Sequence, residues 1–134
     1  MCGFAGILNS QLKDDEISRY LVSMGVSLSH RGPDHQGLFI DESRDIGLVH
    51  RRLSILDLDS RANQPMRSKS GNCLVFNGEI YNYRALRGKL INCGCDFKTS
   101  SDTEVLLQAL ETWGVDATLE KVAGMFAFAF INQQ

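Results

Sequence analysis

The sequence opens with Met1-Cys2-Gly3, which places a cysteine directly behind the initiator methionine. If Met1 is removed, Cys2 carries a thiol and a free α-amine, whose ordinary pKa values of about 8.5 and about 7.7–8.0 allow proton exchange near neutral pH. A cysteine, serine or threonine activated by its own terminal amine is a known type of catalytic nucleophile. The structural interpretation of the same Cys2 is a small apolar side chain at the start of a strand.

Polar clusters at residues 50–54, 77–79 and 101–102 offer groups that could act with such a nucleophile. An arginine can bind a carboxylate through two parallel hydrogen bonds, and an acidic side chain can pair with an ammonium group. An asparagine amide and a neighbouring backbone N–H can stabilise an oxyanion. Together with the terminal thiol, these are the groups that cleavage of an amide in an amino-acid substrate requires.

Each cluster also has a structural explanation. Arg51-Arg52-Leu53-Ser54 could be a solvated strand edge or, because two basic residues precede the serine, a kinase site. Asn77-Gly78 could be only a turn, and Ser101-Asp102 could be only a helix cap. The residues taken one by one leave these alternatives open.

Composition narrows the class of protein. The 134 residues suit one domain, and the 43% hydrophobic and 22% charged fractions are those of a soluble globular chain. The net charge of -2 and the mixing of both signs argue against a nucleic-acid partner. The longest apolar stretch, 122–131, is too short to span a bilayer, and no secretory signal precedes it, so we expect a cytoplasmic protein and no membrane partner.

The four cysteines have neither the density nor the spacing of a disulfide framework. Cys93-Gly-Cys95 is one residue short of the usual metal-binding spacing, and no second pair matches it. We therefore predict no metal site and interpret these thiols as buried or idle, with zinc as the alternative.

Apolar patterning predicts a strand at 3–8 that carries Cys2 at its leading end, followed by an amphipathic helix from 14 to 29. Strands are expected at 37–41 and 46–56, joined by the polar turn 42–45.

A loop with Pro65 inside is expected at 60–70, followed by a strand at 73–76 that runs into Asn77-Gly78, a common hairpin turn. A helix at 83–91 should stop near Gly94.

A second long helix should begin behind a capping box of Ser101 and Glu104 and end at Gly114. The last strand, 124–131, is apolar on both faces, so we expect it to be covered on both sides. The pattern as a whole indicates a layered mixture of helices and sheets.

Seven stretches, in order along nearly the whole chain, resemble the N-terminal glutaminase domain of asparagine synthase (glutamine-hydrolysing), a class II glutamine amidotransferase. They are MCGFAGI at 1–7, HRGPD at 30–34, HRRLSILDL at 50–58, QPM at 64–66, FNGEIYN at 76–82, SDTEVLL at 101–107 and GMFAFAF at 124–130. Other amidotransferases share the opening Cys-Gly and an Asn-Gly pair, but HRGPD with RLSI and NGEIYN favours the asparagine synthase branch.

The resemblance implies an α+β fold, the four-layer αββα sandwich of N-terminal-nucleophile hydrolases. Family members continue past GMFAFA with further strands, so the sandwich is expected to be incomplete at the C-terminus. Residues 1–134 would be a partial glutamine amidotransferase type 2 domain, without the synthetase domain that activates aspartate with ATP.

The resemblance also implies roles for individual residues. Cys2 would be the nucleophile with its α-amine as base, and Asn77 and Gly78 would form the oxyanion hole. Glu79 and Asp102 would hold the substrate ammonium. The α-carboxylate pocket would consist of the Arg52 side chain and the backbone of Leu53, Ser54, Ile55 and Leu56. The HRGPD loop would lie near the site without a transferable catalytic role.

The implied activity is hydrolysis of glutamine to glutamate and ammonia, which a synthetase domain or chain would use to amidate aspartate. This domain would need no cofactor, because ATP and Mg²⁺ belong to the synthetase domain, and a homo-oligomer is possible. The alternatives are a non-catalytic assembly module of the same fold and a class II amidotransferase with another acceptor.

Overall fold

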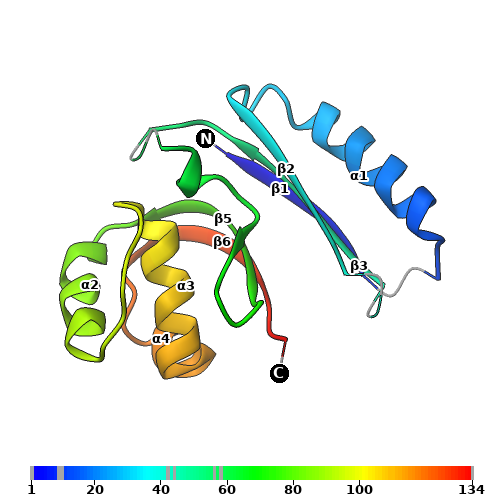
Figure 1. The fold of residues 1–134 in the computed structure, drawn as a ribbon. Helices are drawn as coiled ribbons and strands as arrows, with labels where there is room; N and C mark the ends of the chain where they lie inside the picture. The colour runs from blue at the N-terminus through cyan, green and yellow to red at the C-terminus, as the bar shows by residue number, and fades with distance from the viewer. Residues whose placement is uncertain are drawn as a thin grey trace. The chain divides into compact units, whose positions relative to one another are not determined.

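The computed structural model describes residues 2–8, 11–41, 43, 45–55, 57 and 59–133. The chain forms two compact units. The first unit holds Met1–Ser54 and Asn63–Pro65, and the second holds Ile55–Ala62 and Met66–Gln134. Figure 1 labels the helices and strands of both units.

The first unit is an antiparallel sheet with one helix. Strands β1 (Gly3–Leu8), β2 (His35–Asp41) and β3 (Ile46–Arg52) lie in the order β1-β3-β2. Helix α1 (Asp14–Ser27) covers one face of this sheet (Figure 1). Because β3 is central, its last residues have a neighbouring strand on each side.

Packing between α1 and the central strand explains why the predicted helix forms. Ile17, Leu21 and Val49 are fully buried in a small core between helix and sheet. A Cβ at Gly47 would lie 2.7 Å from Ile17 Cγ2, so this glycine lets the helix approach the sheet closely. Helix α1 starts at Asp14 as predicted and ends at Ser27, just short of the expected boundary.

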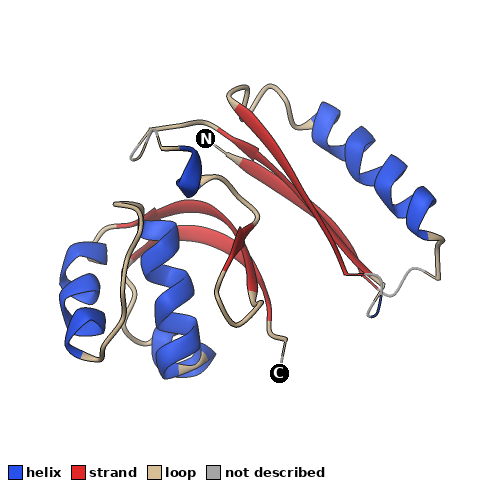
Figure 2. Ribbon diagram, in the orientation of Figure 1, coloured by secondary structure: helices blue, strands red, loops and turns tan. Residues whose placement is uncertain are grey.

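The second unit is another antiparallel sheet, and Figure 2 shows its longer helices, in blue, gathered on one face of that sheet. Its strands lie in the order β4-β5-β6. The elements are η2 (Ser60–Ala62), β4 (Met66–Arg67), β5 (Cys73–Ile80), α2 (Tyr83–Asn92), α3 (Asp102–Trp113), α4 (Val115–Leu119) and β6 (Gly124–Ile131). The predicted α+β class is confirmed, since each unit contributes one sheet and one helical layer.

The core of the second unit lies between this sheet and helices α2 and α3. Its fully buried members include Leu74 and Ile80 from β5, Leu90 from α2 and Leu106 from α3. Full burial of such side chains stabilises the fold by about 1.5–3 kcal/mol each. Strand β5 is therefore fixed firmly, and the polar residues at its end are fixed with it.

One face of β6 follows the prediction and the other does not. Phe126 and Phe128 pack on the core, and the Phe126 ring centroid lies 6.2 Å from that of Phe76. On the opposite face Met125 is 75% exposed and Ala127 is exposed as well. The expectation that both faces of this strand are covered is wrong for these two residues.

The expected hairpin turn at Asn77-Gly78 is wrong, because β5 continues through it to Ile80. Gly78 pairs with Phe126 in the β5–β6 ladder and has a φ of 150°. A Cβ there would clash with the carbonyl oxygen of Met125. The glycine is required by the close approach of β6, and not by a turn.

Several boundaries also differ from the expected ones. Strand β3 ends at Arg52, well before the predicted end at 56, and the short strand β4 lies inside the expected loop 60–70. Gly94 and Gly114 have positive φ values of 89° and 80° behind α2 and α3, which confirms both predicted helix stops. Within the part of the chain that the structure describes, no helix is long and apolar enough to cross a membrane.

Candidate active site

The thiol of Cys2 lies against the backbone that follows β3. Its Sγ accepts a hydrogen bond from the Leu53 N–H at 3.3 Å and donates to the Leu53 carbonyl oxygen at 3.6 Å. The register of β1 and β3, which pairs Gly3 with Arg51, brings the head of one strand to the end of the other. Cys2 thus directly contacts Leu53, a residue of the predicted carboxylate pocket. This contact follows from the register of β1 and β3, which local sequence patterns do not give. Met1 lies outside the described residues.

Arg52, the predicted carboxylate-binding residue, is only 7% exposed at the last position of β3. Its Nη1 donates a hydrogen bond to Asn63 Oδ1 at 2.7 Å. It pairs in register with His35, and burial together with the charges of Arg52 and Arg51 lowers the pKa of that histidine. His35 is therefore kept neutral beside two guanidinium groups.

The HRGPD loop holds this corner of the first unit together. Arg31 Nε donates to the carbonyl oxygen of Cys2 at 3.1 Å. Asp34 Oδ2 accepts from the backbone N–H of Ser54 at 2.7 Å, and the Asp34 N–H donates to the Arg52 carbonyl at 3.0 Å. The sequence marked this loop only as a motif near the site, and the structure adds that Arg31 and Asp34 contact residues with predicted roles.

Asn77, Gly78 and Glu79 lie in the second unit, on the last residues of β5. Side chains alternate along a strand, so Asn77 and Glu79 share the face opposite to Phe76 and the helical core. Asn77 is half-buried and Glu79 is exposed. The strand thus directs an amide and a carboxylate to the same side of the sheet.

Asp102 is the first residue of α3 and is only 4% exposed. Its Oδ2 accepts a hydrogen bond from the Ile80 N–H at 3.0 Å, directly after Glu79 in the chain. Burial raises the pKa of Asp102, and the nearby Glu79 carboxylate raises it further, while hydrogen bonds from backbone N–H groups oppose the rise. A cation placed beside Asp102 and Glu79 would relieve this cost.

The capping prediction for α3 is half correct. Ser101 Oγ accepts from the Glu104 N–H at 3.2 Å, as a cap should. The Glu104 carboxylate instead accepts from Lys98 N at 2.9 Å and Thr99 N at 2.7 Å. It therefore orders the turn that leads into Asp102, which the spacing of Ser101 and Glu104 alone did not indicate.

The predicted site residues are divided between the two units. Cys2, Arg52, Leu53 and Ser54 belong to the first, and Ile55, Asn77, Gly78, Glu79 and Asp102 belong to the second. Ile55 is 70% exposed, and Leu56 lies outside the described residues.

The two units have the fold of the N-terminal-nucleophile amidotransferases. The chain is similar to the solved structure of glutamine phosphoribosylpyrophosphate amidotransferase from B. subtilis, with a TM-score of 0.70 and 22% identity over 97% of this chain and 34% of that one. The chain belongs to the glutamine amidotransferase domain family, whose family model matches residues 1–134.

Two relatives of this chain carry the name of glutamine-hydrolysing asparagine synthetases. Asparagine synthetase [glutamine-hydrolyzing] 1 from Bacillus subtilis (strain 168) is 41% identical over 99% of this chain and 21% of its own length. Asparagine synthetase B [glutamine-hydrolyzing] from Escherichia coli (strain K12) is 32% identical over 100% of this chain and 24% of its own length. The chain thus spans about a fifth to a quarter of the length of these relatives.

Proposed function

We propose that this domain hydrolyses glutamine to glutamate and ammonia, with Cys2 as the nucleophile. Membership of the glutamine amidotransferase family supports the substrate. The observation that carries the proposal is the contact of Cys2 Sγ with the backbone of Leu53, directly after the buried Arg52. The attacking atom and the carboxylate-binding arginine then lie at the same strand end.

The reaction uses the α-amine that removal of Met1 exposes. This amine takes the thiol proton, and the thiolate attacks the side-chain carbonyl carbon of glutamine. The oxyanion collapses, the C–N bond breaks, and the amine returns the proton to the departing ammonia. Water then hydrolyses the γ-glutamyl thioester, which releases glutamate and regenerates the thiol.

The remaining residues bind the substrate and the transition state. Arg52 and the backbone of Leu53 to Leu56 hold the α-carboxylate, because a guanidinium group matches a carboxylate geometrically. Glu79 and Asp102 hold the α-ammonium. The Asn77 amide and the Gly78 N–H stabilise the oxyanion, which is where such donors act most strongly.

The ammonia acceptor is proposed from the relatives. Those described above are named as glutamine-hydrolysing asparagine synthetases. We therefore propose that residues 1–134 act as a glutaminase domain for a synthetase domain or chain that amidates aspartate. A thiol nucleophile needs a reducing compartment, so we place the reaction in the cytoplasm.

Intact-mass analysis after exposure to a diazo-ketone analogue of glutamine tests the proposal. We expect a protein without Met1 that gains one adduct, mapped to Cys2 and suppressed by excess glutamine. Cys2→Ala should abolish the adduct, and Cys93→Ser, which alters an exposed thiol, should not. Retention of Met1, or no adduct on Cys2, would overturn the proposal and favour a non-catalytic module.

A further inference from the structure

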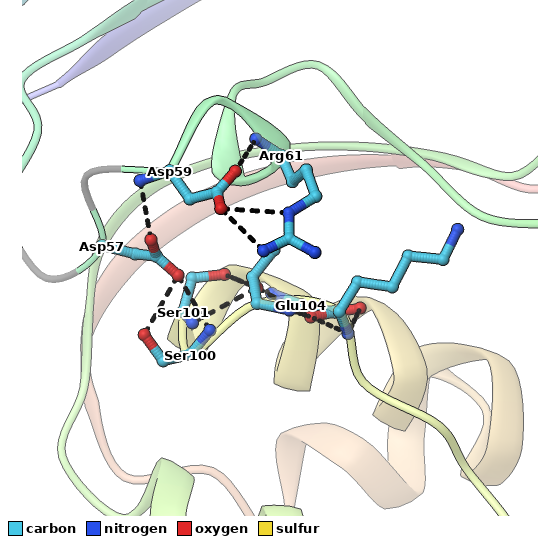
Figure 3. Close-up of polar contacts among 8 residues, drawn as sticks. Asp57, Asp59, Arg61, Ser100, Ser101 and Glu104 are labelled. Atoms are coloured by element: carbon cyan, nitrogen blue, oxygen red, sulfur yellow. Dashed lines mark hydrogen bonds and ion pairs between the residues drawn. The ribbon is translucent and has the colours of Figure 1, made fainter.

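The carboxylate of Asp57 contacts the turn that precedes Asp102, a residue predicted to bind the substrate ammonium. Its Oδ2 accepts hydrogen bonds from Ser100 N at 2.8 Å and from Ser100 Oγ at 3.0 Å (Figure 3). Its Oδ1 accepts from Asp59 N at 2.8 Å. One carboxylate thereby joins two segments that lie far apart in the sequence, within the same unit.

The segment that receives this contact is already ordered from its other side. Glu104 accepts hydrogen bonds from the backbone of Lys98 and Thr99 and from Thr99 Oγ1 at 2.7 Å. Ser101 N in turn donates to Thr99 Oγ1 at 3.3 Å. The turn before α3 is therefore held by a connected set of hydrogen bonds, which links the position of Ser100 to the start of the helix.

The carboxylate of Asp57 is ionised, which strengthens its hydrogen bonds to Ser100. Hydrogen bonds from the backbone N–H groups of Asp59 and Ser100 lower the pKa of Asp57, so the carboxylate is ionised at neutral pH. Hydrogen bonds to an ionised acceptor are stronger than those between neutral groups.

We propose that Asp57 is a positioning residue for recognition of the substrate α-ammonium. It anchors Ser100, two residues before Asp102, to the segment that begins with Ile55 of the predicted carboxylate pocket. Within the second unit, this contact fixes the spacing between Asp57, two residues after Ile55, and Ser100, two residues before Asp102. The inference rests on the proposed glutaminase function and deepens it.

Asp59 offers a matched control beside Asp57. Its Oδ2 accepts from Arg61 Nη2 at 2.7 Å and Nε at 3.0 Å, in an ion pair that is well exposed. Substitution of Asp59 leaves its backbone N–H, and hence that hydrogen bond to Asp57, in place. Asp59→Asn thus changes the charge of the same loop without removing the anchor.

The test compares two ways of labelling Cys2 in the purified protein. The diazo-ketone analogue carries an α-ammonium, whereas iodoacetamide does not. For Asp57→Ala we expect the rate of labelling by the diazo-ketone at low concentration to fall about tenfold or more, with iodoacetamide labelling unchanged. Asp57→Asn keeps one acceptor oxygen of the two but loses the charge, so its labelling rate should fall between those of Asp57→Ala and the unaltered protein. Asp59→Asn should match the unaltered protein.

A double-mutant cycle with Asp102 distinguishes a positioning role of Asp57 from a general loss of structure. In an Asp102→Ala background, Asp57→Ala should add little to the loss, because the group that it positions is gone. In steady-state assays the KM for glutamine should rise while kcat changes little. If Asp57→Ala does not fold, Asp57→Asn and Ser100→Ala carry the same comparison.

Three results decide the matter. Unaltered protein that is not labelled at Cys2 overturns the proposed function and this inference with it. If the unaltered protein is labelled, but Asp57→Ala and Asp57→Asn are labelled at the same rate as Asp59→Asn, the inference is overturned and the proposed function is not. Equal loss with both reagents, or additive loss with Asp102→Ala, makes Asp57 merely structural and also overturns it.

Discussion

Arg52 and Asn63 form a 2.7 Å hydrogen bond between a buried guanidinium group and a side-chain amide oxygen. The amide limits the rotamers of the arginine, which suits a group that is proposed to bind the substrate carboxylate. We predict that Asn63→Ala raises the KM for glutamine about three- to tenfold with little change in kcat, since one hydrogen bond to a charged group is lost. Steady-state glutaminase kinetics measure both constants.

Asn63→Asp is the informative companion of this change. An aspartate keeps an acceptor oxygen beside Arg52 but adds a negative charge, which competes with the substrate carboxylate. The KM should therefore rise more than in Asn63→Ala. A smaller rise would mean that Arg52 does not bind the carboxylate.

Asn77 is predicted to act on turnover more than on binding. Removal of one oxyanion donor costs about 2.7–4 kcal/mol, so Asn77→Ala should lower kcat about 10²- to 10³-fold. The KM should change much less, because the donor acts mainly in the transition state. Circular dichroism of the variant checks that β5 remains formed. Glutaminase turnover that survives this change would disprove the assigned role.

Asp102 should couple substrate recognition to pH. We predict that Asp102→Ala raises the KM for glutamine about tenfold or more and reduces the preference over 4-carbamoylbutanoate, which lacks the α-amino group. Because the pKa of Asp102 is raised, protonation sets in at a higher pH than for an ordinary carboxyl group. The KM of the unaltered enzyme should therefore rise as pH falls through this raised value, and a titration with both substrates would detect it. Equal KM shifts for the two substrates would refute the assignment.

The same carboxylate should cost stability. A folded-state pKa above the unfolded value means that the folded chain binds the proton more tightly, so stability falls as pH rises from the ordinary carboxyl range through the raised pKa. Asp102→Asn keeps an acceptor for the Ile80 N–H and removes the buried charge. Its Tm should exceed that of the unaltered protein at pH 7, and the two should converge in acid. A lower Tm for Asp102→Asn at pH 7 would contradict this.

The elements of the fold could be predicted because they depend on local patterns. Apolar spacing located α1 and α3, and glycines at 94 and 114 marked helix ends. The hairpin turn predicted at Asn77-Gly78 is wrong because this pair is typical of a turn, whereas here the glycine is required by the close approach of the neighbouring strand β6. A preference of the local chain was overridden by a contact from a strand that lies much later in the sequence.

The site could be predicted only as a set of residue types. Cys2, Arg52, Asn77 and Asp102 are candidates because of their chemistry and the family resemblance. Which groups hold them depends on strand register and on contacts between distant segments. Asp34 on Ser54 and Asp57 on Ser100 are such contacts, and no local pattern specifies either of them.

Gly78 and Gly88 provide the sharpest test of the β5–β6 pairing. Gly78 combines a φ of 150° with a backbone contact that excludes a Cβ, whereas Gly88 in α2 has nothing within 4 Å of its own added Cβ. Gly78→Ala should destabilise the protein by at least about 1–3 kcal/mol from backbone strain alone, before the clash is counted. Gly88→Ala should instead stabilise it by about 0.5–1 kcal/mol, because alanine loses less entropy in a helix. Urea unfolding of both variants measures the opposite signs, and an unchanged midpoint for Gly78→Ala would show that β6 does not press against β5 at this residue.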